Sequence, residues 1–210
     1  MNILIVDDHA IVRLGLKQLV EEAYPYAKLE EAATGKDALG LLDRARWDLA
    51  ILDVNLPDQN GVELLKTMKA RQASLPVMML SLHPEEQYAL RALKAGAAAY
   101  LTKERAPDEL ATAIKHVLAG RKFITAGVAE RLADIVFSPV DQQPHERLSD
   151  REFQVLLAIG QGKTVSAIAR DLALSVKTIS TYRTRLLDKL RVKNTTDLIR
   201  YTLDHALVEF

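Results

Sequence analysis

Residues 49–61 read LAILDVNLPDQNG and hold the pattern that decides the fold. Four apolar residues lead into Asp53, and Pro57 and Gly61 are typical of the loop that follows. A short continuous apolar run bounded by turn residues predicts a strand that is buried on both faces. Such strands belong to parallel sheets covered by helices, so this stretch predicts an α/β fold.

The same alternation of an apolar run and a helical pattern occurs five times within residues 1–118. The predicted strands are 3–6, 28–32, 49–52, 77–80 and 98–101, and the predicted helices are 12–20, 36–45, 62–71, 85–95 and 107–118. In a parallel sheet of this kind, ligands bind outside the carboxyl ends of the strands. Polar residues stand at four of those ends: Asp7 with Asp8, Asp53, Ser81 and Lys103.

These polar residues suggest a phosphoryl-transfer site. The carboxylates of Asp7, Asp8 and Asp53 would repel one another, and a divalent cation would relieve that conflict. Ligands that are all oxygen favour magnesium, manganese or calcium over zinc. The Lys103 ammonium and the Ser81 hydroxyl suit a phosphoryl group, and a carboxylate such as Asp53 can act as the nucleophile that carries it. Each residue taken alone is more often a helix cap or a solvated side chain.

The composition excludes several classes of protein. The chain has 210 residues, 28 basic and 28 acidic, and it contains no cysteine. Disulfides, thiolate nucleophiles and cysteine-based metal sites are therefore ruled out. No apolar run approaches the roughly 20 residues that span a bilayer, and the N-terminus lacks a signal-peptide pattern. We expect a cytoplasmic protein with no membrane partner.

The charge is distributed unevenly along the chain. The part up to His145 has 17 basic and 20 acidic residues, whereas the part from Glu146 onward has 11 and 8. Prolines among polar residues in 138–144 indicate a linker, and a helix is predicted over 128–136. We expect a first domain at 1–119, a linker with one helix at 120–146, and a second domain at 147–210 with a different partner.

The second domain is predicted to be all-α, with helices at 150–159, 165–172, 176–190 and 196–207. Residues 176–194 contain six basic residues and one acidic residue. On a helix, an apolar stripe lies opposite small polar and basic side chains; the stripe is Ile179, Tyr182, Leu186 and Leu190. Ser175 is a good N-cap, and the turn before it is short. The pattern predicts a helix-turn-helix whose second helix suits the major groove of DNA.

The motifs resemble two known families. Asp7-Asp8, the stretch from Asp53 through Pro57 to Gly61, Ser81 and Lys103 resemble the receiver domain of two-component response regulators. Leu148-Ser149-Asp150-Arg151-Glu152, Ile168-Ala169 and the run from Leu174 to Ile179 resemble the LuxR-type DNA-binding domain. Together they cover nearly the whole chain, which resembles the NarL/FixJ class of response regulators.

The receiver resemblance implies a flavodoxin-like five-stranded fold and phosphotransfer from a sensor histidine kinase to Asp53. It also implies Mg2+ bound by Asp8, Asp53 and the backbone carbonyl of Asn55, with Asp7 assisting. These assignments extend the phosphoryl-transfer site that the strand ends suggest.

The resemblance further implies a switch pair, Ser81 and Tyr100, in which the hydroxyl turns toward the phosphoryl group and the ring moves inward. Many receivers have proline after the lysine, where this chain has Glu104, so the local backbone geometry stays open. His9, which flanks the pocket, is expected to be a solvated loop histidine.

The LuxR-type resemblance assigns roles in DNA binding by motif position. The residues expected to face bases are Ser180, Thr181 and Thr184, and those expected to hold phosphates are Lys177, Thr178, Arg185 and Lys189. The last helix would form the dimer contact, so a homodimer is expected after phosphorylation. Ala167 and Tyr182 depart from the residues common in the family.

The sequence therefore predicts a DNA-binding transcriptional response regulator that is switched by phosphorylation of Asp53 and is not an enzyme. One alternative is a phosphohydrolase with an aspartyl-phosphate intermediate and a helical cap, which turnover would distinguish. A second is a receiver-shaped domain that ignores phosphate and binds DNA constitutively. Gly162-Lys163-Thr164 resembles the end of a P-loop, but Leu157 stands where that motif needs glycine.

Overall fold

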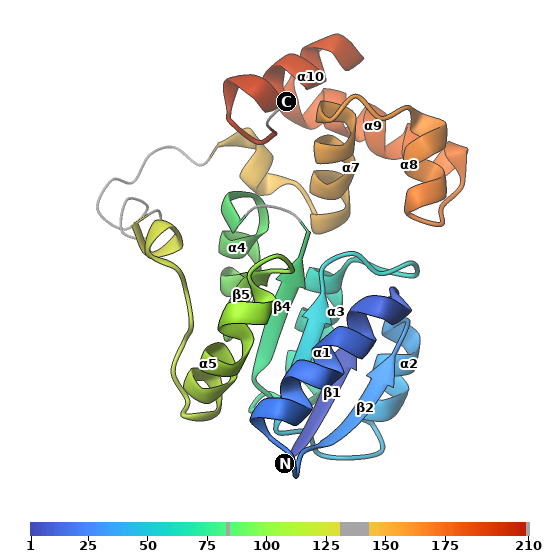
Figure 1. The fold of residues 1–210 in the computed structure, drawn as a ribbon. Coiled ribbons are helices and arrows are strands. Elements are labelled where there is room, and N and C mark those ends of the chain that lie inside the picture. The colour runs from blue at the N-terminus through green and yellow to red at the C-terminus, as the bar shows by residue number, and fades with distance from the viewer. Residues whose placement is uncertain (83–84, 131–142, 209–210) are drawn as a thin grey trace. The chain divides into compact units, whose positions relative to one another are not determined.

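A computed structural model describes residues 1–82, 85–130 and 143–208 (Figure 1). The chain divides into two compact units, Met1–Leu132 and Ala133–Phe210. Each unit has its own hydrophobic core.

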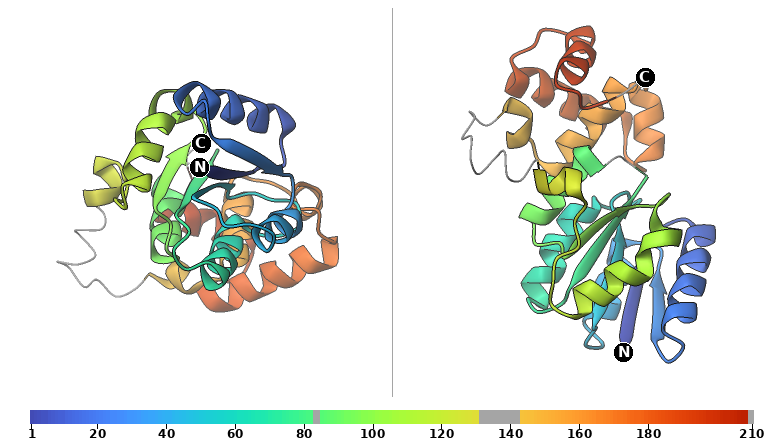
Figure 2. Two further views of the ribbon diagram at one scale, coloured as in Figure 1. Left: turned by 90° about the horizontal axis from the view of Figure 1, so that it is seen from below. Right: turned by 60° about the vertical axis from the view of Figure 1, so that its left-hand side comes forward.

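The first unit contains a parallel sheet of five strands in the order β2-β1-β3-β4-β5. The strands are β1 (Asn2–Val6), β2 (Lys28–Ala32), β3 (Leu49–Asp53), β4 (Val77–Ser81) and β5 (Ala99–Thr102). The helices are α1 (Ala10–Ala23), α2 (Gly35–Leu42), α3 (Gly61–Arg71), α4 (Glu85–Lys94) and α5 (Ala106–Leu118). Helices α1 and α5 cover one face, and α2, α3 and α4 cover the other (Figures 1 and 2). The predicted doubly wound, flavodoxin-like fold is confirmed.

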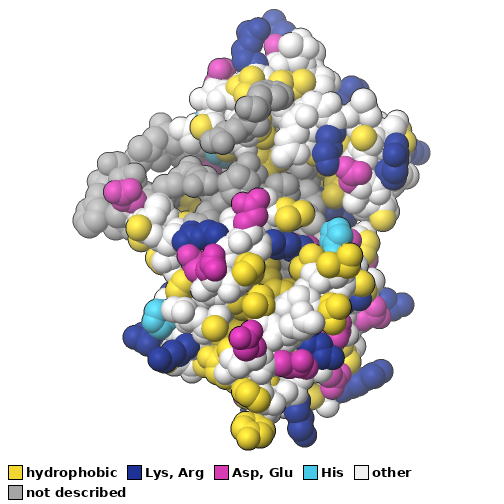
Figure 3. All heavy atoms as spheres, viewed as in Figure 1, with side chains coloured by type: hydrophobic (Ala, Val, Ile, Leu, Met, Phe, Trp, Pro, Cys, Tyr) yellow, Lys and Arg dark blue, Asp and Glu magenta, His cyan; other side chains and the backbone are white. Residues whose placement is uncertain are grey.

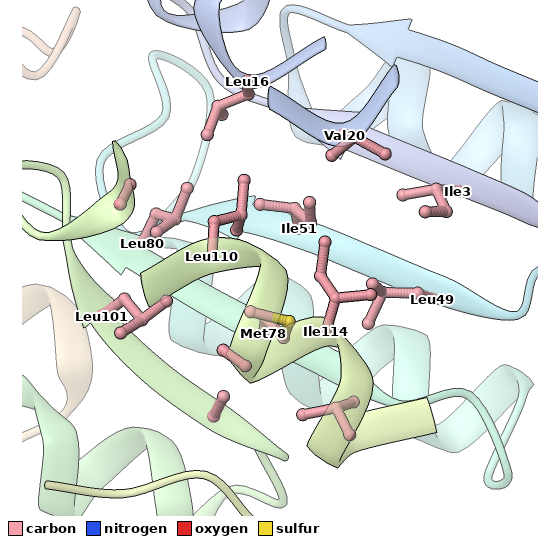
Figure 4. Close-up of a cluster of buried hydrophobic side chains, with 14 of the residues drawn as sticks. Ile3, Leu16, Val20, Leu49, Ile51, Met78, Leu80, Leu101, Leu110 and Ile114 are labelled. Carbon is pink, nitrogen blue, oxygen red and sulfur yellow. The ribbon is translucent and has the colours of Figure 1, made fainter. Parts of the chain in front are cut away.

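The core between the sheet and α1 with α5 is formed by aliphatic side chains (Figure 4). Leu16 and Val20 of α1 and Leu110 of α5 pack against side chains from β1, β3 and β4. Every residue of β3 and β4 is buried, as expected for central strands of a parallel sheet. This packing fixes the carboxyl ends of these strands as a rigid platform for the polar residues beyond them.

The outward face of α1 keeps two large apolar side chains in solvent. Ile11 is 86% exposed and Leu14 is 57% exposed, and hydrophobic side chains are visible on this side of the molecule in Figure 3. The apolar periodicity therefore correctly predicts which face of α1 packs against the sheet. The solvent-facing side of α1 is less polar than that of a typical amphipathic helix.

All the regular secondary structure in the described part of the second unit is helical, as predicted. It contains the 3-10 helix η1 (Pro144–Arg147), α7 (Asp150–Gly160), α8 (Val165–Asp171), α9 (Val176–Leu190) and α10 (Thr195–Asp204). Ser149 and Glu152 form a capping box at the start of α7. The predicted N-cap of α9 is confirmed, because the Ser175 hydroxyl accepts a hydrogen bond from Thr178 N at 3.0 Å.

Residues with a left-handed backbone conformation lie in the turn between α8 and α9 and just after the end of α10. Ala173, with φ 50°, lies in the turn between α8 and α9. Helix α10 ends at Asp204 instead of the expected 207, because Ala206 is left-handed at φ 49° and Leu207 N bonds back to Thr202 O at 2.8 Å.

The predicted linker is described only in part. Residues 126–130 are helical, while the rest of the predicted helix 128–136 and residues 138–142 of the linker lie outside the described residues. Within the described ranges, no helix combines the length and the apolar composition that a bilayer crossing requires.

Candidate functional site

Four strand ends bring the predicted pocket residues to one edge of the sheet. Asp7 follows β1, Asp53 ends β3, Ser81 ends β4 and Lys103 follows β5. Asp7 is 1% exposed, Asp53 2%, and Ser81 is fully buried. Because the strands are parallel and in register, residues far apart in sequence meet here, as the pattern predicted.

Lys103 joins the two buried carboxylates. Its Nζ lies 2.6 Å from Asp7 Oδ2 and 2.9 Å from Asp53 Oδ2. Its backbone N donates to Ser81 O at 2.8 Å, which ties the position of the lysine to the end of β4. Burial lowers the pKa of Lys103, but attraction to Asp53 and bonds to both carboxylates outweigh burial and leave the pKa raised. The ammonium therefore stays charged between two acids.

The surroundings of Asp53 disfavour the ionised form of its carboxyl group. Burial raises its pKa to about 6; Lys103 opposes this rise and the neighbouring Asp7 adds to it. The backbone N–H of Asn55 also lowers this pKa, and among the described residues the buried Oδ1 of Asp53 has no hydrogen bond of good geometry. At neutral pH the group is mostly ionised, so it is available both as a nucleophile and as a ligand for a cation.

The pocket has a donor set that fits a hard divalent cation. One ligand atom from each of Asp7, Asp8, His9 and Asp53 lies within 4.8 Å of the others. Three of the four donors are carboxylates, and the buried Oδ1 of Asp53 lacks a partner among the described residues. Oxygen donors of this kind suit Mg2+. The carboxylates that could hold such an ion are those of Asp7, Asp8 and Asp53.

His9 takes part in this cluster, although a solvated loop histidine was expected. Its ring is 58% exposed, yet Nδ1 lies 2.7 Å from Asp8 Oδ1 and 3.4 Å from Asp7 Oδ1. Its backbone N also donates to Asp7 Oδ1 at 2.8 Å. The expectation of exposure holds, but the ring is paired with the acids.

Arg13 is a pocket residue that the sequence did not indicate. Its Nη1 donates to Asp7 O at 2.6 Å, and its Nε donates to Glu31 Oε2 at 3.3 Å. The side chain thereby fixes the end of β1 to the neighbouring strand β2. The only local signal is its place one turn after His9, which does not reveal a contact across strands.

The loop after Asp53 is held at both ends. Asn55 and Asn60 form an antiparallel bridge, and Gly61 N donates to Val54 O at 2.8 Å. Asn60 Oδ1 accepts from Val62 N at 2.8 Å and caps α3. These bonds therefore give Asn55, two residues after Asp53, a defined backbone position. Tyr100 lies in β5 opposite Met79 and is buried.

The raised pKa of Asp53 predicts how the stability of the metal-free protein depends on pH. The folded group has a pKa of about 6 against the ordinary 3.8, so the folded state retains a proton that the unfolded chain has released. The free energy of unfolding should fall by about 3 kcal/mol over the whole titration, from below pH about 4 to above pH about 6. Urea unfolding in EDTA, followed by the fluorescence of Trp47, the chain's single tryptophan, measures this change.

Asp53→Asn is the control for this pH dependence, because it removes the titrating group and retains the shape. Its unfolding free energy should change little over the same interval, and it should exceed that of the wild type at pH 7. A wild-type profile that does not fall between these pH values would contradict the burial argument.

Helix α9 presents the residues predicted to contact DNA. Lys177, Thr181, Thr184 and Arg185 are exposed, and Thr178 and Ser180 are partly exposed. Thr181 Oγ1 donates to Lys177 O at 3.0 Å, and Thr184 Oγ1 donates to Ser180 O at 3.1 Å. Since each threonine proton is already donated to the backbone, the two hydroxyls offer acceptor oxygens to a ligand.

Lys189 has a partner that the sequence did not indicate. Its Nζ donates to Glu152 Oε2 at 2.7 Å and so connects α9 to the capping box of α7. Burial raises the pKa of Glu152, but hydrogen bonds from Lys189 and Ser149 outweigh burial and lower it. Lys189, predicted to hold a DNA phosphate, therefore also stabilises the packing of two helices.

The pocket and the helix-turn-helix define a class of protein: a regulator in which a doubly wound α/β domain with a buried acidic pocket precedes a helix-turn-helix domain. Residues 3–115 match the family model of the response regulator receiver domain. Residues 146–202 match the model of bacterial regulatory proteins of the luxR family. The chain therefore belongs to the bacterial response regulators of the NarL/FixJ class.

Individual relatives match this chain over nearly its whole length and theirs. Response regulator UvrY of Escherichia coli is 32% identical, over 99% of this chain and 95% of its own. Response regulator GacA of Pseudomonas aeruginosa is 31% identical, over 100% and 98%. The structure of RcsB from Salmonella enterica serovar Typhimurium, bound to promoter rprA with a phosphomimetic, is 26% identical with a TM-score of 0.62, covering 96% and 98%.

Proposed function

We propose that this chain is a DNA-binding transcription regulator switched by transfer of a phosphoryl group to Asp53 from a sensor histidine kinase. The observation that carries the proposal is the Lys103 ammonium, 2.9 Å from a buried and partly unsatisfied Asp53 carboxylate. A phosphoryl group on Asp53 would bring three acceptor oxygens toward this ammonium.

In the proposed transfer, an oxygen of Asp53 attacks the phosphorus of a phosphohistidine. The new P–O bond forms as the P–N bond breaks, and the imidazole leaves with the electron pair. Asp8, Asp53 and the backbone carbonyl of Asn55 would hold Mg2+, with Asp7 assisting, and the ion would supply charge neutralisation. Lys103 holds a positive charge opposite the acids and orients the transferred group.

The switch follows from the strand ends that meet at the pocket. Ser81 would turn its hydroxyl toward the phosphoryl group, and Tyr100 would occupy an inward position. This favours one conformation of the β4–α4–β5–α5 surface and promotes a homodimer. The domains are assigned to 1–119, a linker with one helix at 120–146, and 147–210.

The proposed DNA interface is α9, with Ser180, Thr181 and Thr184 toward bases and Lys177, Thr178, Arg185 and Lys189 toward phosphates. Support comes from the exposure of this face, its excess of basic residues and the similarity to the DNA-bound RcsB. A homodimer would read two half-sites spaced by about one helical turn. The site of action is the cytoplasm, and no membrane partner is involved.

The proposal is tested with the full chain and a small acyl phosphate as phosphodonor. Mass spectrometry should locate one phosphoryl group on Asp53, dependent on Mg2+. Selection of binding sites from random duplex DNA should enrich one sequence, more strongly with the phosphodonor. A phosphohydrolase would instead turn the donor over rapidly without such enrichment, whereas a regulator holds its phosphoryl group and shows little phosphatase turnover.

Single substitutions on α9 should separate phosphate contacts from base contacts. Arg185→Ala should weaken binding to all duplexes alike and reduce the slope of log affinity against log salt by about one. Thr181→Ala should cost about 1–3 kcal/mol on the selected site and relax the preference at one position. Fluorescence anisotropy at several salt concentrations measures both effects. If the two variants behaved identically, the division of roles would be wrong.

A further inference from the structure

Asp58 connects the loop after the phosphoacceptor to another helix. It lies between Asp53 and α3, and its carboxylate accepts two backbone hydrogen bonds from the start of α2. Oδ1 accepts from Gly35 N at 2.9 Å, and Oδ2 accepts from Lys36 N at 2.9 Å. These are among the first N–H groups of a helix, which have no partner within the helix, so a two-oxygen acceptor satisfies both at once.

The loop and the start of α2 approach each other closely at Gly35. Gly35 is buried, and a Cβ there would lie 2.0 Å from Nε2 of Gln59, the residue after Asp58. An alanine at position 35 would therefore have to displace the side chain of Gln59. The N-cap of α2 is a separate residue, Thr34, whose Oγ1 accepts from Asp37 N at 3.1 Å. The N-cap contact of α2 is therefore made by Thr34 and is separate from the two bonds to Asp58.

The same loop carries Asn55, whose backbone carbonyl is a proposed ligand of Mg2+. Its two ends are fixed by the Asn55–Asn60 bridge and by the Asn60 cap on α3. Between these points, Pro57 has no N–H to donate, and the Asp58 carboxylate accepts its two hydrogen bonds from the start of α2. Asp58 therefore ties the middle of the loop, between the bridged residues Asn55 and Asn60, to the start of α2.

We infer that Asp58 is a positioning residue for the acidic pocket, which holds the Asn55 carbonyl in place for a divalent cation by anchoring the loop to α2. The inference rests on the proposed function. Asp58 does not touch the ion; it acts through the loop. An asparagine would retain one acceptor oxygen and present an NH2 group to the other N–H, so it cannot reproduce the contact.

The test measures Mg2+ affinity of the full chain by isothermal titration, with no phosphodonor present. Asp58→Ala should weaken Mg2+ binding by about tenfold, the effect typical of losing an outer contact to a metal site. Asp58→Asn should weaken it to a smaller extent. In the metal-free protein, amide exchange at Gly35 and Lys36 should accelerate in Asp58→Ala.

Thr34→Ala is the matched control, because it weakens the start of the same helix without touching the loop. It should lower the unfolding midpoint, read from Trp47, and leave Mg2+ affinity within about twofold of the wild type. Loss of the Asp58 charge alone would also weaken cation binding, but that effect shrinks with added salt. The ratio of wild-type to Asp58→Ala affinity should therefore persist at high ionic strength.

Three outcomes would overturn the positioning role: equal Mg2+ affinity of Asp58→Ala and wild type, an equal loss in Thr34→Ala, or a ratio that vanishes at high salt. A wild-type chain that binds no Mg2+ would overturn the proposed function together with this inference. The two failures are therefore distinguishable.

Discussion

Asp53→Asn is expected to abolish the gain in DNA affinity that a phosphodonor produces. In the wild type this gain should be between about 5-fold and 150-fold, the range typical of coupling between two sites. The amide lacks the nucleophilic carboxylate oxygen, so no acyl phosphate can form. The measurement is fluorescence anisotropy with a duplex selected from random DNA, with and without donor and Mg2+.

The DNA affinity of the unphosphorylated protein should separate two effects of this variant, the loss of phosphorylation and the loss of the Asp53 charge. Asparagine is neutral, so Lys103 keeps one buried carboxylate, Asp7, instead of two. If the basal affinity is unchanged while the gain disappears, the carboxylate acts through phosphorylation. Asp43→Asn is the control: this acid is exposed and paired with Arg71, and its variant should retain the full gain. A persistent gain in Asp53→Asn would contradict the proposed coupling.

Gly61→Ala is expected to destabilise the first unit by about 3 kcal/mol, at the upper end of overpacking effects. A Cβ at this position would lie 2.1 Å from the backbone oxygen of Asp53 and 2.8 Å from Val54 Cα. These are backbone atoms, so relief requires moving the strand end that carries the phosphoacceptor. The variant should therefore lose both stability and phosphorylation by the acyl phosphate.

Gly40→Ala provides the control for the general effect of replacing a helical glycine. Gly40 lies inside α2, and a Cβ there would meet nothing within 4 Å. Because alanine is the better helix former, this variant should gain up to about 1 kcal/mol. Urea unfolding followed by Trp47 measures both variants. Effects of the same sign and size would show that the close approach at Gly61 does not matter.

The strands and the principal pocket residues could be predicted because their signals are local. An apolar run ending in Asp53 predicts a buried strand with a polar end, and the run ending in Ser81 does the same. Parallel alignment then places such ends on one edge without any further information. The N-cap Ser175 was equally predictable, because capping involves residues three apart.

The residues that the sequence did not reveal act across long separations in the chain. Asp58 bonds to α2, 22 and 23 positions away, and Lys189 bonds to Glu152, 37 positions away. Neither contact has a periodic or spacing signal, because partners brought together by packing are not constrained to any separation. The same holds for Arg13, which reaches the neighbouring strand.

The sequence by itself determined the alternation of strands and helices, the all-helical second unit and the chemistry at the strand ends, since burial periodicity and turn residues are properties of short segments. Tertiary structure alone decided that Lys103 bridges Asp7 and Asp53 and that burial keeps Asp53 near a pKa of 6. Distances and desolvation arise only when separate segments pack together, and they give an ordinary carboxylate its reactivity.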